Sequence, residues 1–167
     1  LVVSAFFFFF RLCLAAEAVG DENEIEAALK VVELLDLTGK IITADALHCH
    51  HRMTEAVTAK KADYVLALKG NRPDWLAQAT QHFEMKPGKT SAKDLAKTHG
   101  RFEWRKAEVI AADHPLTKGH AAFIRITSAR DSCETVTRYY MASKLFAAKD
   151  ALAIVRELTG GLGADVA

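Results

Sequence analysis

One carboxylate stands where a predicted strand ends. Asp45 follows Lys40-Ile-Ile-Thr-Ala44, a short run rich in β-forming residues. A carboxylate buried at such a point is costly unless a cation or hydrogen-bond donors surround it, so Asp45 is a candidate metal ligand. The alternative is that Asp45 caps the helix that follows. Phosphoryl chemistry usually needs two or three acids around one or two metal ions, so Asp45 requires carboxylate partners from elsewhere.

The run His48-Cys-His-His51 holds four side chains of the types that bind zinc. Neighbouring side chains diverge, however, and a closed tetrahedral site usually draws two pairs of ligands from two segments. The sequence has no second pair. We interpret the run as the polar beginning of a helix.

Two arginines are candidates for binding phosphate groups. Arg101 follows His99-Gly100, and Arg138 begins Arg138-Tyr-Tyr140, both in stretches with strand character. A guanidinium group binds phosphate oxygens through paired hydrogen bonds, which suits a DNA backbone. Taken singly, each arginine is also explained by the solvated face of a strand.

The composition of the 167 residues narrows the classes of function. Half of the residues are hydrophobic and 26% are charged, and 22 basic against 21 acidic residues leave a net charge of +1. No global field therefore attracts nucleic acid or an anionic membrane, and DNA contact requires a local patch. Three scattered cysteines without CxxC spacing favour a reducing compartment, which we expect to be the cytoplasm. The apolar start is interrupted by Arg11, well short of the ~20 residues of a membrane span, so no membrane partner is expected.

The first half of the chain is predicted to alternate strands and helices. We expect a hairpin of strands at 1–6 and 12–19, a helix at 24–37 with a capping box at Asn23 and Glu26, a strand at 40–44, a helix at 51–61 and a strand at 64–68. The last three elements form a strand–helix–strand unit, whose strands are expected to be parallel. Ligands gather at the carboxyl ends of such strands, where Asp45 and Lys69 lie.

The second half is predicted to be mainly antiparallel. A helix at 74–83 and a polar linker at 86–93 precede three strands, at 101–106, 121–128 and 135–141. Their alternating residues indicate one antiparallel section. A helix at 147–158 and a glycine-rich tail follow.

Seven short motifs occur in an order that resembles the H-repeat-associated, or Rhs-linked, DDE transposases. The motifs are Val3-Ser-Ala-Phe6, Leu14-Ala-Ala-Glu-Ala-Val19, Asn23-Glu-Ile25, Ile42-Thr-Ala-Asp-Ala-Leu47, Ala62-Asp-Tyr-Val-Leu-Ala-Leu-Lys-Gly-Asn71, His99-Gly-Arg101 and Arg138-Tyr-Tyr-Met-Ala-Ser143. No single motif is specific, but the ordered set is. The resemblance implies an α/β, RNase H-like fold, with a mixed sheet, flanking helices and a β-rich insertion. It divides the chain into a partial core at 1–98, the insertion at 99–143, and a helix with a divergent tail at 144–167.

The resemblance also implies a site and its partners. Family members cut and join DNA at the ends of insertion sequences with Mg²⁺, or Mn²⁺, held by two aspartates and a glutamate. Asp45 matches the second aspartate. Arg101 and Arg138 then become candidate contacts to the DNA backbone.

Two departures from the family pattern lead us to expect a chain that is shortened at both ends and inactive alone. The family's first aspartate lies on a strand that precedes the Val3–Phe6 motif. Its glutamate lies in a His-Trp-x-Ile-Glu-Asn run beyond an arginine like Arg156, where this chain has Glu157-Leu-Thr-Gly-Gly161. Glu157 directly follows the arginine, so we do not assign it the role of the third acid.

Two other classes of function stay open. One is a non-catalytic DNA-binding or dimerising remnant, because an RNase H-like sheet without its first strand has an exposed edge that favours a homodimer. The other is an oxidoreductase fragment, because Val155–Ala167 is similar to part of the cofactor domain of zinc-type alcohol dehydrogenases. That stretch lacks a GxGxxG motif.

Overall fold

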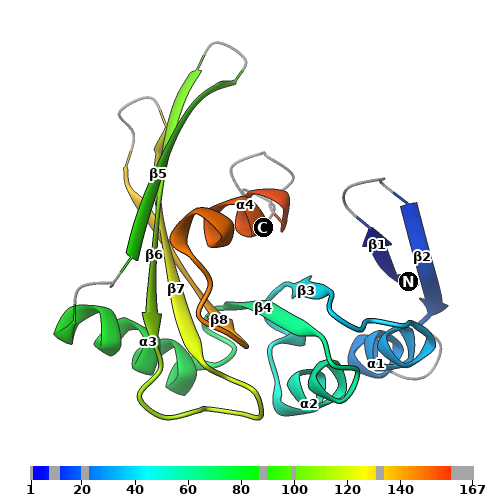
Figure 1. Cartoon of the computed structure of the whole chain (residues 1–167). Coiled ribbons are helices and arrows are strands. Elements are labelled where there is room, and N and C mark those ends of the chain that lie inside the picture. The colour runs from blue at the N-terminus through cyan, green and yellow to red at the C-terminus, as the bar shows by residue number, and fades with distance from the viewer. Residues whose placement is uncertain are drawn as a thin grey trace.

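The computed structural model describes residues 2–7, 12–19, 23–86, 90–98, 101–130 and 134–158. A six-stranded mixed sheet has the strand order β3-β4-β8-β7-β6-β5, and β1 and β2 form a separate hairpin (Figure 1). The strands are β1 (Val2–Phe7), β2 (Leu12–Ala18), β3 (Ile41–Ala44), β4 (Asp63–Leu68), β5 (Thr90–Thr98), β6 (Arg101–Ala111), β7 (Ala122–Arg130) and β8 (Val136–Ala142). The helices are α1 (Glu24–Leu34), the short 3-10 helix η1 (Ala46–His48), α2 (His51–Ala59), α3 (Pro73–Met85) and α4 (Ala148–Leu158). The predicted α/β class is confirmed, and the arrangement is consistent with an RNase H-like fold.

The strands β3 and β4 are joined through α2 and pair in parallel, as the strand–helix–strand pattern predicts. The register sets Ala44 beside Leu66, so both strands run toward the same edge of the sheet. On its other side β4 pairs antiparallel with β8. Because β4 has a neighbour on each side and helices on each face, Tyr64 and Val65 are fully buried.

The antiparallel section has four strands, whereas the sequence pattern predicted three. Across the sheet from β8 come β7, β6 and then β5, which occupies Thr90–Thr98. We expected residues 86–93 to form a polar linker, and that expectation is wrong from Thr90 onward. The edge strand β5 pairs with β6 alone. Charged residues on an edge strand discourage pairing with a further strand, and they give β5 a composition that resembles a loop. The sheet joins strands from both sides of the expected boundary at 98/99, and that division stays a prediction.

Alternation along β4 supplies an apolar core on each face of the sheet. Tyr64 and Leu66 belong to the core that includes residues of α1, α2 and α3, together with Phe123 of β7. Val65 belongs to the second core, to which α4 contributes Leu152. Figure 1 shows β5 and β6 extending beyond these helices at one end of the molecule.

The helix α1 begins as predicted and ends three residues early. The side chain of Asn23 accepts a hydrogen bond from the backbone nitrogen of Glu26 at 3.1 Å, as the capping box predicts. The helix stops because Leu35 adopts an extended backbone. Arg52 of α2 donates two hydrogen bonds to Glu26, which ties α2 to the first turn of α1.

The predicted hairpin is confirmed as β1 and β2. Residues 8–10 of the Phe6–Phe10 run, Cys133 and the tail at 159–167 lie outside the described residues. Among the residues that the structure describes, no helix is long and apolar enough to cross a membrane.

A buried histidine organises the loop between β6 and β7. The Nδ1 atom of His120 accepts a hydrogen bond from the Leu116 nitrogen at 3.1 Å, and its Nε2 atom donates to the Ala122 carbonyl at 3.1 Å. The ring also packs edge-on against Phe123. Burial lowers the pKa of His120 to about 4, so the ring is neutral in the folded chain.

We expect stability to fall with acidification because of His120. In the unfolded chain the ring binds a proton below about pH 6.5, whereas the folded chain resists it until about pH 4, so stability is lost between those values. The advantage of the wild type over His120→Gln should shrink by up to about 1.4 kcal/mol per pH unit in that window. Urea unfolding of both proteins between pH 7 and pH 5 measures it. A difference in unfolding free energy that does not change with pH contradicts the assignment.

Candidate active site

Asp45 lies immediately after β3, at the carboxyl end of the parallel pair. Its Oδ1 atom accepts a hydrogen bond from the Leu47 nitrogen at 3.1 Å, so Asp45 caps η1. The second carboxylate oxygen has no partner among the described residues. Asp45 is exposed, so the argument that a buried carboxylate requires a cation does not apply to it. The cap fixes the side chain and leaves one oxygen facing solvent.

The loop after β3 is tied to the loop after β4. Asn71 donates a hydrogen bond from Nδ2 to the carbonyl of Ala46 at 2.6 Å, and Arg72 donates from Nε to the carbonyl of Cys49 at 3.1 Å. The guanidinium of Arg72 also lies over the ring of Trp75, with 5.0 Å to the centroid. These contacts position the first residue of η1 and the residue that follows it relative to α3.

The four residues of the His48–His51 run contact four different neighbours. In order along the chain, the side chains lie against Glu24, Met141, the backbone nitrogen of Met53, and Thr117. His50 is the N-cap of α2, which confirms that the run is the polar beginning of a helix. Among the described residues, no group of three or more His, Cys, Asp or Glu side chains is placed to hold a metal ion.

Burial sets the ionisation of two residues in this run. Burial raises the pKa of the Cys49 thiol to about 12, so this thiol is protonated at neutral pH. Burial also lowers the pKa of His50, and the nearby His48 and Arg72 act in the same direction. A neutral His50 is required for the cap, because its Nδ1 atom accepts a hydrogen bond from Met53.

The structure brings Arg138 to the same end of the sheet as Asp45. The register pairs Leu68 with Tyr139, so Arg138 lies one position beyond the end of β4. Arg138 is half-buried and pairs with Ile126, on the face that α4 covers. Arg101 is the first residue of β6, and its side chain lies outside the described part of the structure.

The comparison with known families decides the class of protein. The sequence profile described as "Transposase DDE domain" matches residues 6–156. The chain belongs to this DDE transposase family. The resemblance to H-repeat-associated transposases is thereby confirmed at the level of the family.

Relatives of this DDE transposase domain include three proteins of Escherichia coli K12. The chain is 36% identical to "Putative protein YbfL" over 87 residues, 34% identical to "H repeat-associated putative transposase YbfD" over 87 residues, and 32% identical to "H repeat-associated putative transposase YhhI" over 109 residues. These matches cover 50%, 50% and 62% of this chain, and 23%, 34% and 29% of the relatives. The chain thus spans about a quarter to a third of the length of these relatives. No solved structure matches it.

Asn71 is a positioning residue of the transposase domain that was not predicted from the sequence. Asn71 closes the motif that begins at Ala62, and that motif was the available signal. Its contact with Ala46 joins segments 25 residues apart, which no local pattern reveals.

We expect Asn71→Ala to loosen the loop that carries Asp45. Loss of the hydrogen bond to the Ala46 carbonyl should lower the free energy of unfolding by about 1–2 kcal/mol and speed amide hydrogen exchange at 45–49. Urea unfolding and hydrogen exchange measure the two effects. Gln78→Ala, at an exposed position of α3, is the control and should change neither. If the exchange rates of the two variants match, Asn71 does not position this loop.

Proposed function

We propose that this chain takes part in metal-dependent DNA strand cleavage and transfer, with Asp45 as one carboxylate ligand of Mg²⁺ or Mn²⁺. The observation that carries the proposal is the position of Asp45 at the carboxyl end of two parallel strands, with one oxygen held by Leu47 and the other open. Carboxylate oxygens are the ligands that these cations prefer. The names of the relatives YbfD and YhhI support a transposase.

Asp45 by itself would supply one ligand of a metal site. A bound ion would polarise a phosphate group and activate the attacking hydroxyl, and such an ion requires further acidic ligands. Among the described residues, none joins Asp45 in a group that could hold an ion. We therefore propose that this chain alone does not cleave DNA and that Asp45 acts together with acids that the described residues do not provide.

We further propose that Arg138 and Arg101 bind the phosphate backbone of DNA at insertion-sequence ends. The position of Arg138 beside the end of β4, close in register to the edge that carries Asp45, supports this role. A non-catalytic remnant that binds DNA or forms a homodimer is the second candidate. The open side of β3, which pairs only with β4 among the described strands, favours it because edge strands promote association.

The metal assignment predicts a selective effect of Asp45→Asn. In a titration with Mn²⁺ followed by NMR, the Leu47 amide of the wild type should broaden, and this broadening should be lost in Asp45→Asn. Asp36→Asn is a matched control, because Asp36 is exposed and accepts from the Thr38 nitrogen at 3.1 Å in the same geometry. Broadening at Leu47 that persists in Asp45→Asn refutes the metal role.

The DNA assignment predicts a different pattern. Arg138→Ala should weaken binding to duplex DNA and reduce the slope of log affinity against log salt by about one. Arg52→Ala, which removes the exposed ion pair between α2 and Glu26 of α1, should leave both unchanged. If Asp45→Ala removes cation binding but keeps DNA binding, both roles stand. Duplex binding that survives in Arg101→Ala and Arg138→Ala contradicts the DNA-contact role of these arginines.

A further inference from the structure

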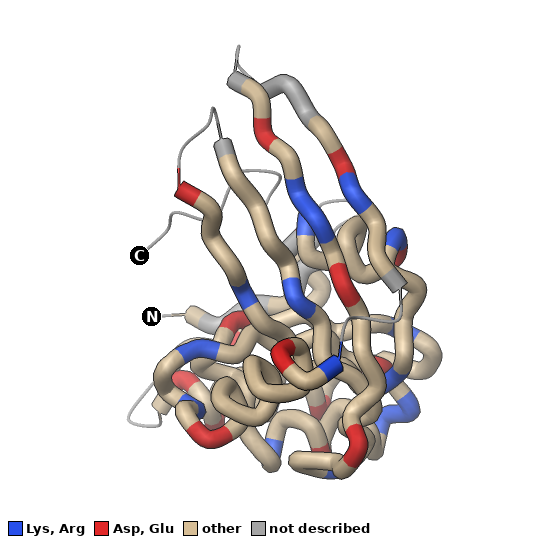
Figure 2. The backbone as a smooth tube through the Cα atoms, turned by 90° about the vertical axis from the view of Figure 1, so that its left-hand side faces the viewer, with Lys and Arg blue, Asp and Glu red and all other residues tan. Residues whose placement is uncertain are grey.

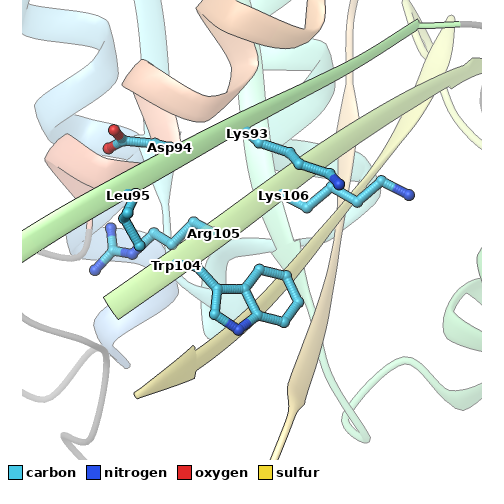
Figure 3. A pocket seen from close by; sticks show the side chains of 6 residues that line it. All are labelled: Lys93, Asp94, Leu95, Trp104, Arg105 and Lys106. Atoms are coloured by element: carbon cyan, nitrogen blue, oxygen red, sulfur yellow. The ribbon is translucent and has the colours of Figure 1, made fainter. Parts of the chain in front are cut away.

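A hollow of about 420 Å³ lies over the β5–β6 hairpin, away from Asp45. Six residues line it: Lys93, Asp94, Leu95, Trp104, Arg105 and Lys106 (Figure 3). The hairpin extends beyond the helices that cover the rest of the sheet (Figure 1). None of the six lining residues belongs to either apolar core.

Strand register brings a tryptophan and two lysines together on one face. Leu95 is directly opposite Trp104, and Lys93 is directly opposite Lys106, two residues along each strand. Trp104 is 39% exposed and Leu95 is 70% exposed, whereas Trp75, in the core, is 4% exposed. An indole ring that is partly exposed on a sheet offers a flat apolar surface to a ligand.

On the opposite face of the hairpin, the charged side chains of Asp94 and Arg105 have ion-pair partners. Asp94 and Arg105 are paired in register there, and Arg156 of α4 donates to Asp94 at 3.2 Å. Arg105 binds Glu103, and both side chains are nearly buried. Arg138 also belongs to this face, through its pairing with Ile126. The exposed tryptophan face is thus distinct from the face that carries the arginine proposed above.

The tryptophan face has an excess of positive charge. Two lysines directly opposite each other on one face repel, which destabilises the pair. Lys106 is 2.9 Å from Glu108, but Glu108 is shared with Arg125 at 2.8 Å. Lys93 has no carboxylate within ion-pair distance among the described residues. Figure 2 shows the basic segments of β5 and β6 side by side. An anion between the two amines would relieve the repulsion.

The combination of an anion site with an exposed aromatic ring points to a nucleotide. A phosphate satisfies the lysines, and a base stacks on an indole ring, as in proteins that bind single strands. Bases inside a duplex are already stacked on each other and cannot reach a ring on a sheet surface. We propose that this face binds an unpaired nucleotide of a DNA strand, with its phosphate between Lys93 and Lys106 and its base on Trp104. This proposal rests on the proposed action on DNA, and it adds that the β5–β6 hairpin binds unpaired rather than duplex DNA.

The test uses the tryptophan fluorescence of the full chain. The chain has two tryptophans, so the substitution Trp75→Phe leaves Trp104 as the single fluorescent indole. Three probes are compared: a single-stranded oligothymidylate, an abasic oligomer of equal length, and a duplex. The oligothymidylate should quench Trp104 and bind at least fivefold more tightly than the abasic oligomer. The double variant Lys93→Ala/Lys106→Ala should lose at least tenfold in affinity for both single strands.

Variants of Trp104 separate stacking from charge. By anisotropy of labelled probes, Trp104→Ala should bind the oligothymidylate as weakly as the abasic oligomer, and Trp104→Phe should regain part of the difference. Lys149→Ala, an exposed lysine on α4, is the control and should bind like the parent chain. Equal affinity of the parent chain for the oligothymidylate and the abasic oligomer overturns the proposal.

The outcomes also distinguish this proposal from the one before it. If duplex binding depends on Arg138 while Trp104→Ala changes nothing, the nucleotide site is wrong and the DNA function stands. If Trp104→Ala instead reduces self-association in sedimentation and leaves DNA binding intact, the face is a contact between copies, which also overturns the nucleotide site. If no probe binds at all, both proposals fail.

Discussion

The double pairing of β4 is the constraint on which the rest of the structure depends. This strand is hydrogen-bonded in parallel to β3 and antiparallel to β8, and no position from Tyr64 to Leu68 is exposed. Its first residues are also tied to the end of β8, since Tyr64 donates its backbone N–H to Ser143 at 2.9 Å and accepts from the Ser143 nitrogen. A shift of one residue would turn the two apolar cores to the wrong faces. The ends of β3, β4 and β8 are therefore fixed together, and with them Asp45 and Arg138.

Elements with strong local patterns could be predicted from the sequence, because local physics determines them. The 3.6-residue periodicity and the Asn23 cap identify α1, and the strand–helix–strand pattern identifies β3, α2 and β4 with their parallel pairing. The strand β5 could not be predicted, because one edge of the strand has no partner strand and its residues, Thr-Ser-Ala-Lys-Asp-Leu-Ala-Lys-Thr, are mostly small or charged, as in a linker. Because β5 was not predicted, the pairing of Lys93 with Lys106 could not be predicted either.

The candidate site could be predicted in part. The end of a β-rich run indicated Asp45, and the structure places it where parallel strands end. The exposure of Asp45 was not predicted. It arises because β3 has a neighbouring strand on one side only, and the residues of β3 are half-buried or exposed. Capping and metal binding were weighed as alternatives, yet the geometry makes them compatible, since the cap uses one oxygen of two. The contact of Asn71 with Ala46 is tertiary, so it required the structure.

The burial of Cys49 has a consequence for the thiol chemistry of the chain. At neutral pH almost none of this sulfur is thiolate, and its side chain is 1% exposed between α2 and the sheet. Cys13, in contrast, is exposed on β2. A thiol reagent reaches Cys49 only when the packing between α2 and β8 opens, so the rate at which Cys49 is alkylated reports how often the core opens locally. The reaction of Cys13 in the same molecule provides the reference rate for an accessible thiol.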